Sequence, residues 1–156
     1  MALKIYIAYG TASDQVTALR LQALGAVNGL VVYVPPASTR HDAHGDLDPY
    51  SRQQFLDCDV VLGVVTTAPS QACRQELALG SQMKKRTIVL AAMAQASTLE
   101  AYFPGRVVLF DPADPTRAEQ HIVRILRESD LQADAAKALL ALGTIALGLL
   151  IFAPSE

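Results

Sequence analysis

An uninterrupted apolar run from Val60 to Val65 constrains the fold more than any other stretch of this sequence. Most of its residues are valines, which favour an extended strand, and no polar residue alternates with them. A strand that is apolar on both faces has to be covered on both faces, as in the parallel sheets of α/β proteins. The run therefore predicts an α/β fold in which this strand, spanning Asp59 to Thr66, is buried between helical layers.

Other strand-like runs recur along the chain with helical stretches between them, which predicts a parallel sheet with helices on both faces. We therefore expect a flavodoxin-like three-layer α/β sandwich with five parallel strands in the order 2-1-3-4-5. The four remaining strands are expected at Leu3 to Tyr9, Leu30 to Val34, Arg86 to Ala91 and Arg106 to Phe110.

Helices are predicted from apolar spacing and from capping residues. Asp48-Pro49 and Asp114-Pro115 each place an N-cap residue before a proline at the first helical position, which indicates where the second and the last helix begin. The first helix is expected to end near Gly25 to Gly29. Its apolar face is predicted from residues that recur at helical spacing, namely Val16, Leu19, Ala23, Leu24 and Val27.

The C-terminal part of the chain is distinctly apolar, with no charged residue from Ala138 to Ala153. We divide the chain into a domain at 1–128, a linker and helix cap at 129–134, and a hydrophobic helix at 135–153. A helix of about 19 residues is roughly 28 Å long, close to the thickness of a bilayer's hydrocarbon core. The basic residues that precede it predict a cytoplasmic domain, tail-anchored to a membrane. The alternative is a helix that packs on protein or forms an oligomer interface.

Composition and charge exclude some classes of function. The formal net charge is −2 and there is no basic run, so no nucleic-acid partner is expected. Cys58 and Cys73 lie in or beside apolar segments without the spacing of a zinc site or a disulfide framework, which favours packing in a reducing compartment. No metal site is expected.

The loops that leave the first and third strands should form the ligand crevice, because the order of a doubly wound sheet reverses between these strands. Glu76 lies about one and a half turns into the helix that follows the third strand, and Ser70 is its expected N-cap. The first helix begins just after Gly10, so its N-terminus is a potential phosphate site. The residues predicted to bind substrate at this edge are Tyr9, Gly10, Thr11, Ser13 and Ser70.

The connection over residues 35–48 leaves the same edge and is longer than the usual loop between a strand and a helix. Long loops at a ligand edge are commonly functional. Arg40 in this loop is predicted to contact substrate, and the loop as a whole is a potential interaction element.

The segment from Ser70 to Leu77 resembles the Ser-x-Trp-Cys-x-x-Glu-Leu segment of TIR (Toll/interleukin-1 receptor) domains, with Ala72 in place of the tryptophan. The first strand running into Tyr9-Gly10 is similar to their opening strand, and the likeness covers residues 3–128. In the enzymatic members the glutamate that matches Glu76 is essential for cleaving the nicotinamide–ribose bond of NAD+. The resemblance implies an NAD+ nucleosidase in immune or cell-death signalling, with NAD+ as substrate and no cofactor.

The TIR resemblance also implies that the chain acts when assembled. The loop at 35–48 would be the BB loop, through which neighbouring domains associate, with the C-terminal helix as a second contact. A non-catalytic TIR-type assembly module is therefore one alternative.

The chain is also similar to nucleoside 2-deoxyribosyltransferase-like proteins, which begin with a lysine-isoleucine-tyrosine strand and use a glutamate in a helix. The matching residues here are Lys4 to Tyr6 and Glu76. Both enzyme families perform N-glycosidic chemistry, in which a carboxylate stabilises an oxocarbenium-like transition state.

Overall fold

The computed structural model describes residues 2–36 and 46–129. Over these residues the chain forms one parallel sheet with the strand order β2-β1-β3-β4-β5, as the sequence predicts. The expected flavodoxin-like α/β fold is confirmed, and each strand lies within one or two residues of its predicted position. The strands are β1 (Lys4–Tyr9), β2 (Val31–Tyr33), β3 (Val60–Val65), β4 (Arg86–Ala92) and β5 (Val107–Phe110).

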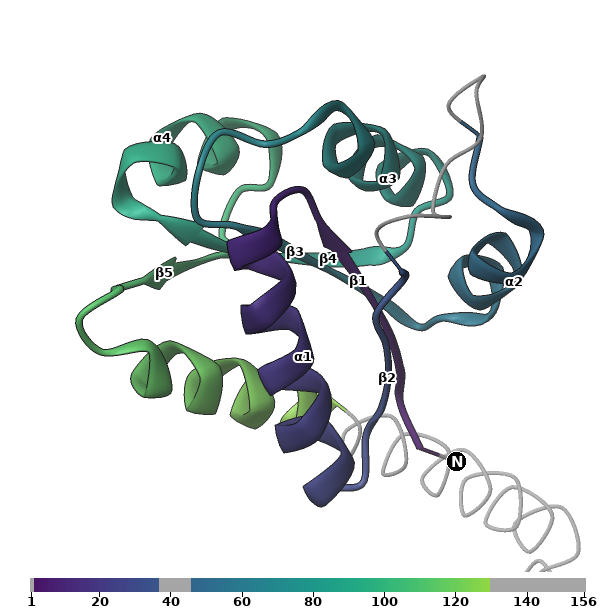
Figure 1. Ribbon diagram of the computed structural model, residues 1–156, viewed down its shortest axis with the longest axis horizontal. Coiled ribbons are helices and arrows are strands. Elements are labelled where there is room, and N and C mark those ends of the chain that lie inside the picture. The colour runs from purple at the N-terminus through teal and green to yellow at the C-terminus, as the bar shows by residue number, and fades with distance from the viewer. Residues whose placement is uncertain (1, 37–45, 130–156) are drawn as a thin grey trace, which may run out of the picture.

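Helices cover both faces of the sheet (Figure 1). On one face lie α1 (Ala12–Val27) and a helix over 115–129, which bury Leu21 and Ile122 against the sheet. The opposite face carries α2 (Pro49–Asp57), α3 (Gln71–Gln82) and α4 (Met93–Tyr102). All six residues of β3 are buried, which is the physical reason for its uninterrupted apolar sequence.

Successive residues of β1 point into the two opposite cores, because side chains alternate along a strand. Ile5, Ile7 and Tyr9 join the core under α1, whereas Tyr6 joins the core under α2 and α3. This alternation decides which of the two tyrosines of β1 lies on the same face as Glu76.

The apolar face predicted for α1 is wrong, although the helix itself forms where it is expected. Val16 and Leu19 are about half exposed or more, and Val27 is 86% exposed. Small residues such as Ala18 and Gly25 face the sheet instead, because they let the helix axis approach the strands closely. Leu21 is buried beside them, whereas Val16, Leu19 and Val27 project outward, and spacing alone could not distinguish the two faces.

Side-chain caps begin the helices at the positions that the sequence indicates. The Asp48 carboxylate accepts hydrogen bonds from the backbone N–H groups of Tyr50 and Ser51, with Pro49 at the first helical position. The Ser70 hydroxyl accepts from the N–H of Cys73 at 3.1 Å. By contrast, α4 starts directly after β4 at Ala92 without a side-chain cap, and this helix was not located from sequence.

No helix within residues 2–36 and 46–129 is long and apolar enough to cross a membrane. Arg40, most of the predicted loop and the predicted linker and hydrophobic helix from residue 130 onward lie outside the described residues.

Candidate functional site

Glu76 lies on the inner face of α3, over the sheet. The adjacent Leu77 packs against Gly63 of β3, where an added Cβ would lie 2.9 Å from Leu77 Cδ2. The glycine in the middle of the valine-rich strand therefore lets α3 pack close to the sheet at this point. As a result, the Glu76 side chain is only 1% exposed, which is unusual for a carboxylate.

A tyrosine hydroxyl holds the Glu76 carboxyl group in place. Tyr6 Oη donates a hydrogen bond of 2.6 Å to Glu76 Oε1, and Tyr6 itself is fully buried. The two residues are 70 positions apart in sequence, so the contact is made only by the fold. A buried carboxylate requires such donors because its transfer from water is costly when unpaired.

Aromatic rings surround this hydrogen bond on the side of α2. The ring of Phe55 meets the Tyr6 ring edge-on at a centroid distance of 4.9 Å, and the Tyr33 ring lies 5.7 Å from it. Tyr33 in turn shares a 2.9 Å hydrogen bond with the hydroxyl of Ser51, and burial raises the pKa of Tyr33 above its usual value. The Tyr6 ring is thus fixed by packing as well as by its hydroxyl.

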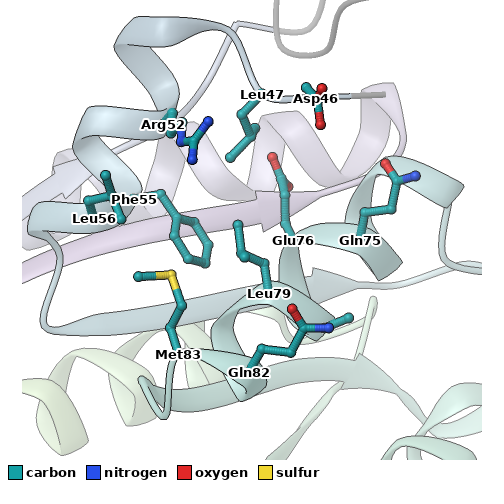
Figure 2. Close-up of a pocket in the computed structure, with 11 residues that line it drawn as sticks. Asp46, Leu47, Arg52, Phe55, Leu56, Gln75, Glu76, Leu79, Gln82 and Met83 are labelled. Carbon is teal, nitrogen blue, oxygen red and sulfur yellow. The ribbon is translucent and has the colours of Figure 1, made fainter. Parts of the chain in front are cut away.

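A cavity of about 440 Å³ lies between α2 and α3 and is lined by Glu76 (Figure 2). Its volume lies toward the lower end of the range for small-molecule sites, about 300–1,000 Å³. The lining consists of Leu47, Phe55, Leu56, Ala78, Leu79 and Met83 among the apolar residues, and Asp46, Arg52, Gln75, Glu76 and Gln82 among the polar ones.

The loops after β1 and β3 meet at the carboxyl edge of the sheet, where sequence topology predicted the crevice. A Cβ added at Gly10 would lie 2.5 Å from Ser70 Oγ and 2.9 Å from Ser70 N, so only glycine allows this close approach. The carboxylate of Asp14 joins the same two loops, since it accepts hydrogen bonds from the backbone N–H and from the hydroxyl of Thr66. The contact between Gly10 and Ser70 is thus fixed from two sides.

The other residues predicted to bind substrate, among those that the structure describes, lie at the start of α1 or in the core under α1. Thr11 caps α1 by accepting from the N–H of Asp14, and its hydroxyl lies 3.2 Å from that of Ser13. Tyr9 is buried on the α1 face, across the sheet from Glu76, and its hydroxyl donates to the carbonyl of Pro35. The structure therefore brings Gly10 and Ser70 together but places Tyr9 in the opposite core.

Sequence reasoning missed three residues that shape this site. Tyr6 could have been found from the alternation of side chains along β1. It lies two positions from Ala8 and so on the same face, whereas Ile7 and Tyr9 lie on the opposite face. Asp14 in the first turn of α1 and Arg52 in α2 carried no distinguishing signal, since acidic and basic residues at helix positions are commonly solvated.

Comparisons with known proteins support the fold but do not establish a family. No protein-family model and no curated protein matches the sequence. The chain is similar to the sugar isomerase domain of the RpiR transcription factor from Sphaerobacter thermophilus, with a TM-score of 0.53 and 13% identity over 92% of this chain and 79% of that chain. At this identity the likeness shows the α/β fold alone.

TIR domains are also among the solved structures that the chain resembles. Those of the activated Roq1 resistosome, which directly recognises the pathogen effector XopQ, align with 88% of this chain and 78% of that chain, at 14% identity and a TM-score of 0.45. The site around Glu76 therefore has to be interpreted from its own chemistry.

Proposed function

We propose that this chain is an N-glycosidic hydrolase of the TIR type, which cleaves the nicotinamide–ribose bond of NAD+ with Glu76 as its catalytic residue. The observation that carries the proposal is a nearly fully buried carboxylate that lines a nucleoside-sized cavity and is oriented by a tyrosine hydroxyl. A carboxylate that is buried at a cavity and held by a hydrogen bond is more typical of a functional site than of a solvated helix face.

The proposed reaction needs little beyond one oriented carboxylate. The bond between C1′ of the ribose and the nicotinamide nitrogen breaks, the bonding pair leaves with neutral nicotinamide, and positive charge develops on the ribose. The almost completely buried Glu76 carboxylate stabilises that charge, because electrostatic interactions are stronger away from bulk water. Water then adds to C1′ and releases one proton, which yields ADP-ribose.

Tyr6 has a positioning role in this scheme. Its hydroxyl fixes Glu76 Oε1, and the packing of Phe55 against its ring fixes the hydroxyl. A carboxylate held in one orientation does not have to reorganise as charge develops in the transition state. Gly10, Thr11, Ser13 and Ser70 remain the predicted substrate contacts at the carboxyl edge, whereas Tyr9 faces the other core.

A second candidate is a nucleoside 2-deoxyribosyltransferase-like activity. The observation that favours it is that the tyrosine of the lysine-isoleucine-tyrosine strand, Tyr6, is the residue that contacts Glu76. In that reaction the glutamate attacks C1′ as a nucleophile, the base leaves, and a second base displaces the glutamate. A tyrosine that donates to the same carboxylate holds it in one orientation for attack on C1′.

One experiment separates the two candidates. Purified full-length protein is incubated either with NAD+ or with a deoxynucleoside and a second free base, and products are resolved by chromatography. Nicotinamide release from NAD+ that is lost in Glu76→Gln supports the hydrolase. Base exchange without NAD+ cleavage supports the transferase and refutes the first proposal.

We further propose that the chain acts in assembled form, with the predicted hydrophobic helix at 135–153 as a membrane tether. Confinement to a membrane raises the effective concentration of the domain and so favours association. Flotation of the full chain with lipid vesicles tests the tether, with a chain that ends at Glu128 as the comparison. Equal recovery of both in the unbound fraction would refute it.

A further inference from the structure

Arg52 is a cation at the Glu76 cavity that forms no ion pair within the described residues. It lies in the first turns of α2, and its side chain projects from that helix toward Leu47 and the cavity (Figure 2). Its guanidinium group makes no hydrogen bond or ion pair with any residue of 2–36 or 46–129. Among the described residues that line this cavity, it is the only basic one.

The surroundings of Arg52 favour an anion over a structural partner. Apolar side chains, among them Phe55, Leu56 and Leu47, line the cavity beside it, and the exposed guanidinium group is available to a ligand in the cavity. A planar guanidinium group matches two oxygens of a phosphate at once. Asp46 lines the same cavity, and its carboxylate weakens the attraction for an anion. It forms no ion pair with the Arg52 guanidinium group.

The start of α1 is the other potential phosphate site, but its own side chains occupy it. The Thr11 hydroxyl already accepts the N–H of Asp14. The Asp14 carboxylate is buried within the first turn, where its negative charge offsets the positive end of the helix dipole. A phosphate there would lie against the Asp14 carboxylate, whereas Arg52 offers a planar guanidinium group at the cavity that Glu76 also lines.

We propose that Arg52 binds the phosphate next to the ribose on which Glu76 acts, so that the site selects 5′-phosphorylated nucleosides and dinucleotides over free nucleosides. This inference rests on the proposed N-glycosidic function and specifies its substrate class. Ribose at Glu76 and phosphate at Arg52 place the sugar across the cavity between α3 and α2.

The test compares two ligands that differ only by the phosphate. Nicotinamide mononucleotide and nicotinamide riboside are titrated into full-length Glu76→Gln protein, in which turnover is blocked, and dissociation constants are measured by calorimetry. We expect the mononucleotide to bind about 10-fold more tightly, the lower end of the range for a charge-assisted hydrogen bond because Arg52 is exposed. The preference should decrease as salt is raised.

In Glu76→Gln/Arg52→Gln protein the ratio of the two constants should fall to nearly one, and Arg52→Lys should restore part of it. Arg106→Gln is the matched control. Arg106 is exposed at the amino end of β5, so this substitution removes the same charge at a place away from the cavity. Circular dichroism of each variant establishes that it is folded.

The outcomes distinguish this inference from the function on which it rests. Equal affinity for the two ligands in Glu76→Gln protein overturns the role of Arg52 and leaves the proposed function untouched. A phosphate preference that persists in Arg52→Gln but is lost in Ser13→Ala overturns it in favour of the α1 site. Failure of both ligands to bind, together with no NAD+ cleavage by the wild type, refutes the proposed function and this inference with it.

Discussion

Replacing Tyr6 by phenylalanine tests the hydrogen bond on which the account of the site depends. The change removes one hydroxyl and leaves the ring, so the edge-on contact with Phe55 at 4.9 Å is preserved. What is lost is the 2.6 Å donation to Glu76 Oε1 between two side chains that are buried almost completely. The substitution therefore removes the hydroxyl and keeps the packing of the ring.

The expected cost follows from the partners involved. Hydrogen bonds to charged groups contribute about 1.5–3 kcal/mol, against about 0.5–1.5 kcal/mol for neutral pairs. Tyr6→Phe should therefore lower the free energy of unfolding by about 1.5–3 kcal/mol. Tyr33→Phe is the matched control, because it removes a neutral hydrogen bond of 2.9 Å to Ser51 from a neighbouring ring and should cost about 1 kcal/mol or less.

Urea unfolding followed by far-ultraviolet circular dichroism measures both variants, since the chain has no tryptophan for fluorescence. In a parallel NAD+ assay, Tyr6→Phe should lower kcat more than it raises KM, because a less strictly oriented Glu76 stabilises the transition state less well. The reasoning is refuted if Tyr6→Phe costs no more stability than Tyr33→Phe and leaves kcat unchanged.

Three further predictions concern the loops and the buried thiol. Gly10→Ala should destabilise the protein by about 1–3 kcal/mol in urea unfolding, because the new Cβ would lie 2.5 Å from Ser70 Oγ and the Ser70 backbone would have to move. Ser70→Ala removes the cap on the N–H of Cys73 and should cost about 1 kcal/mol in the same assay; no measurable loss would contradict the capping role. Burial raises the pKa of Cys58 from 9.0 to about 11. The folded state therefore keeps a proton that the unfolded state releases, so the stability contributed by Cys58 is complete below pH 9 and is lost as pH rises from about 9 to 11. Unfolding midpoints across this range should fall less steeply in Cys58→Ala than in the wild type.

The fold could be predicted because its strongest signals are local. An apolar run such as Val60 to Val65 has few alternatives to a doubly covered strand, and Asp48-Pro49 is a helix start by its own chemistry. By contrast, the buried face of α1 depends on how near the helix lies to the sheet, which is a property of the tertiary structure. Spacing therefore selected the larger apolar residues Val16 and Val27, which are exposed, over Ala18.

The site was predictable in part for the same reason. Glu76 and the meeting of Gly10 with Ser70 follow from topology, because parallel strands bring their following loops to one edge. Sheet topology did not identify Tyr6 or Arg52, although the alternation of β1 places Tyr6 on the face that α3 covers. Tyr6 reaches Glu76 only because Gly63 draws α3 toward the sheet, and Arg52 gains its significance only from the cavity that α2 and α3 enclose.

Nicotinamide release from NAD+ by the wild type and by Glu76→Gln tests the central claim most directly. The full chain is assayed at a series of protein concentrations, with and without lipid vesicles, so that assembled protein is included. Glu128→Gln serves as the control, because it makes the same chemical change on an exposed helix position far from the cavity. We predict turnover by the wild type and by Glu128→Gln, and a loss of at least about 100-fold in folded Glu76→Gln. Equal rates in wild type and Glu76→Gln, or no turnover by assembled wild-type protein, would contradict the account.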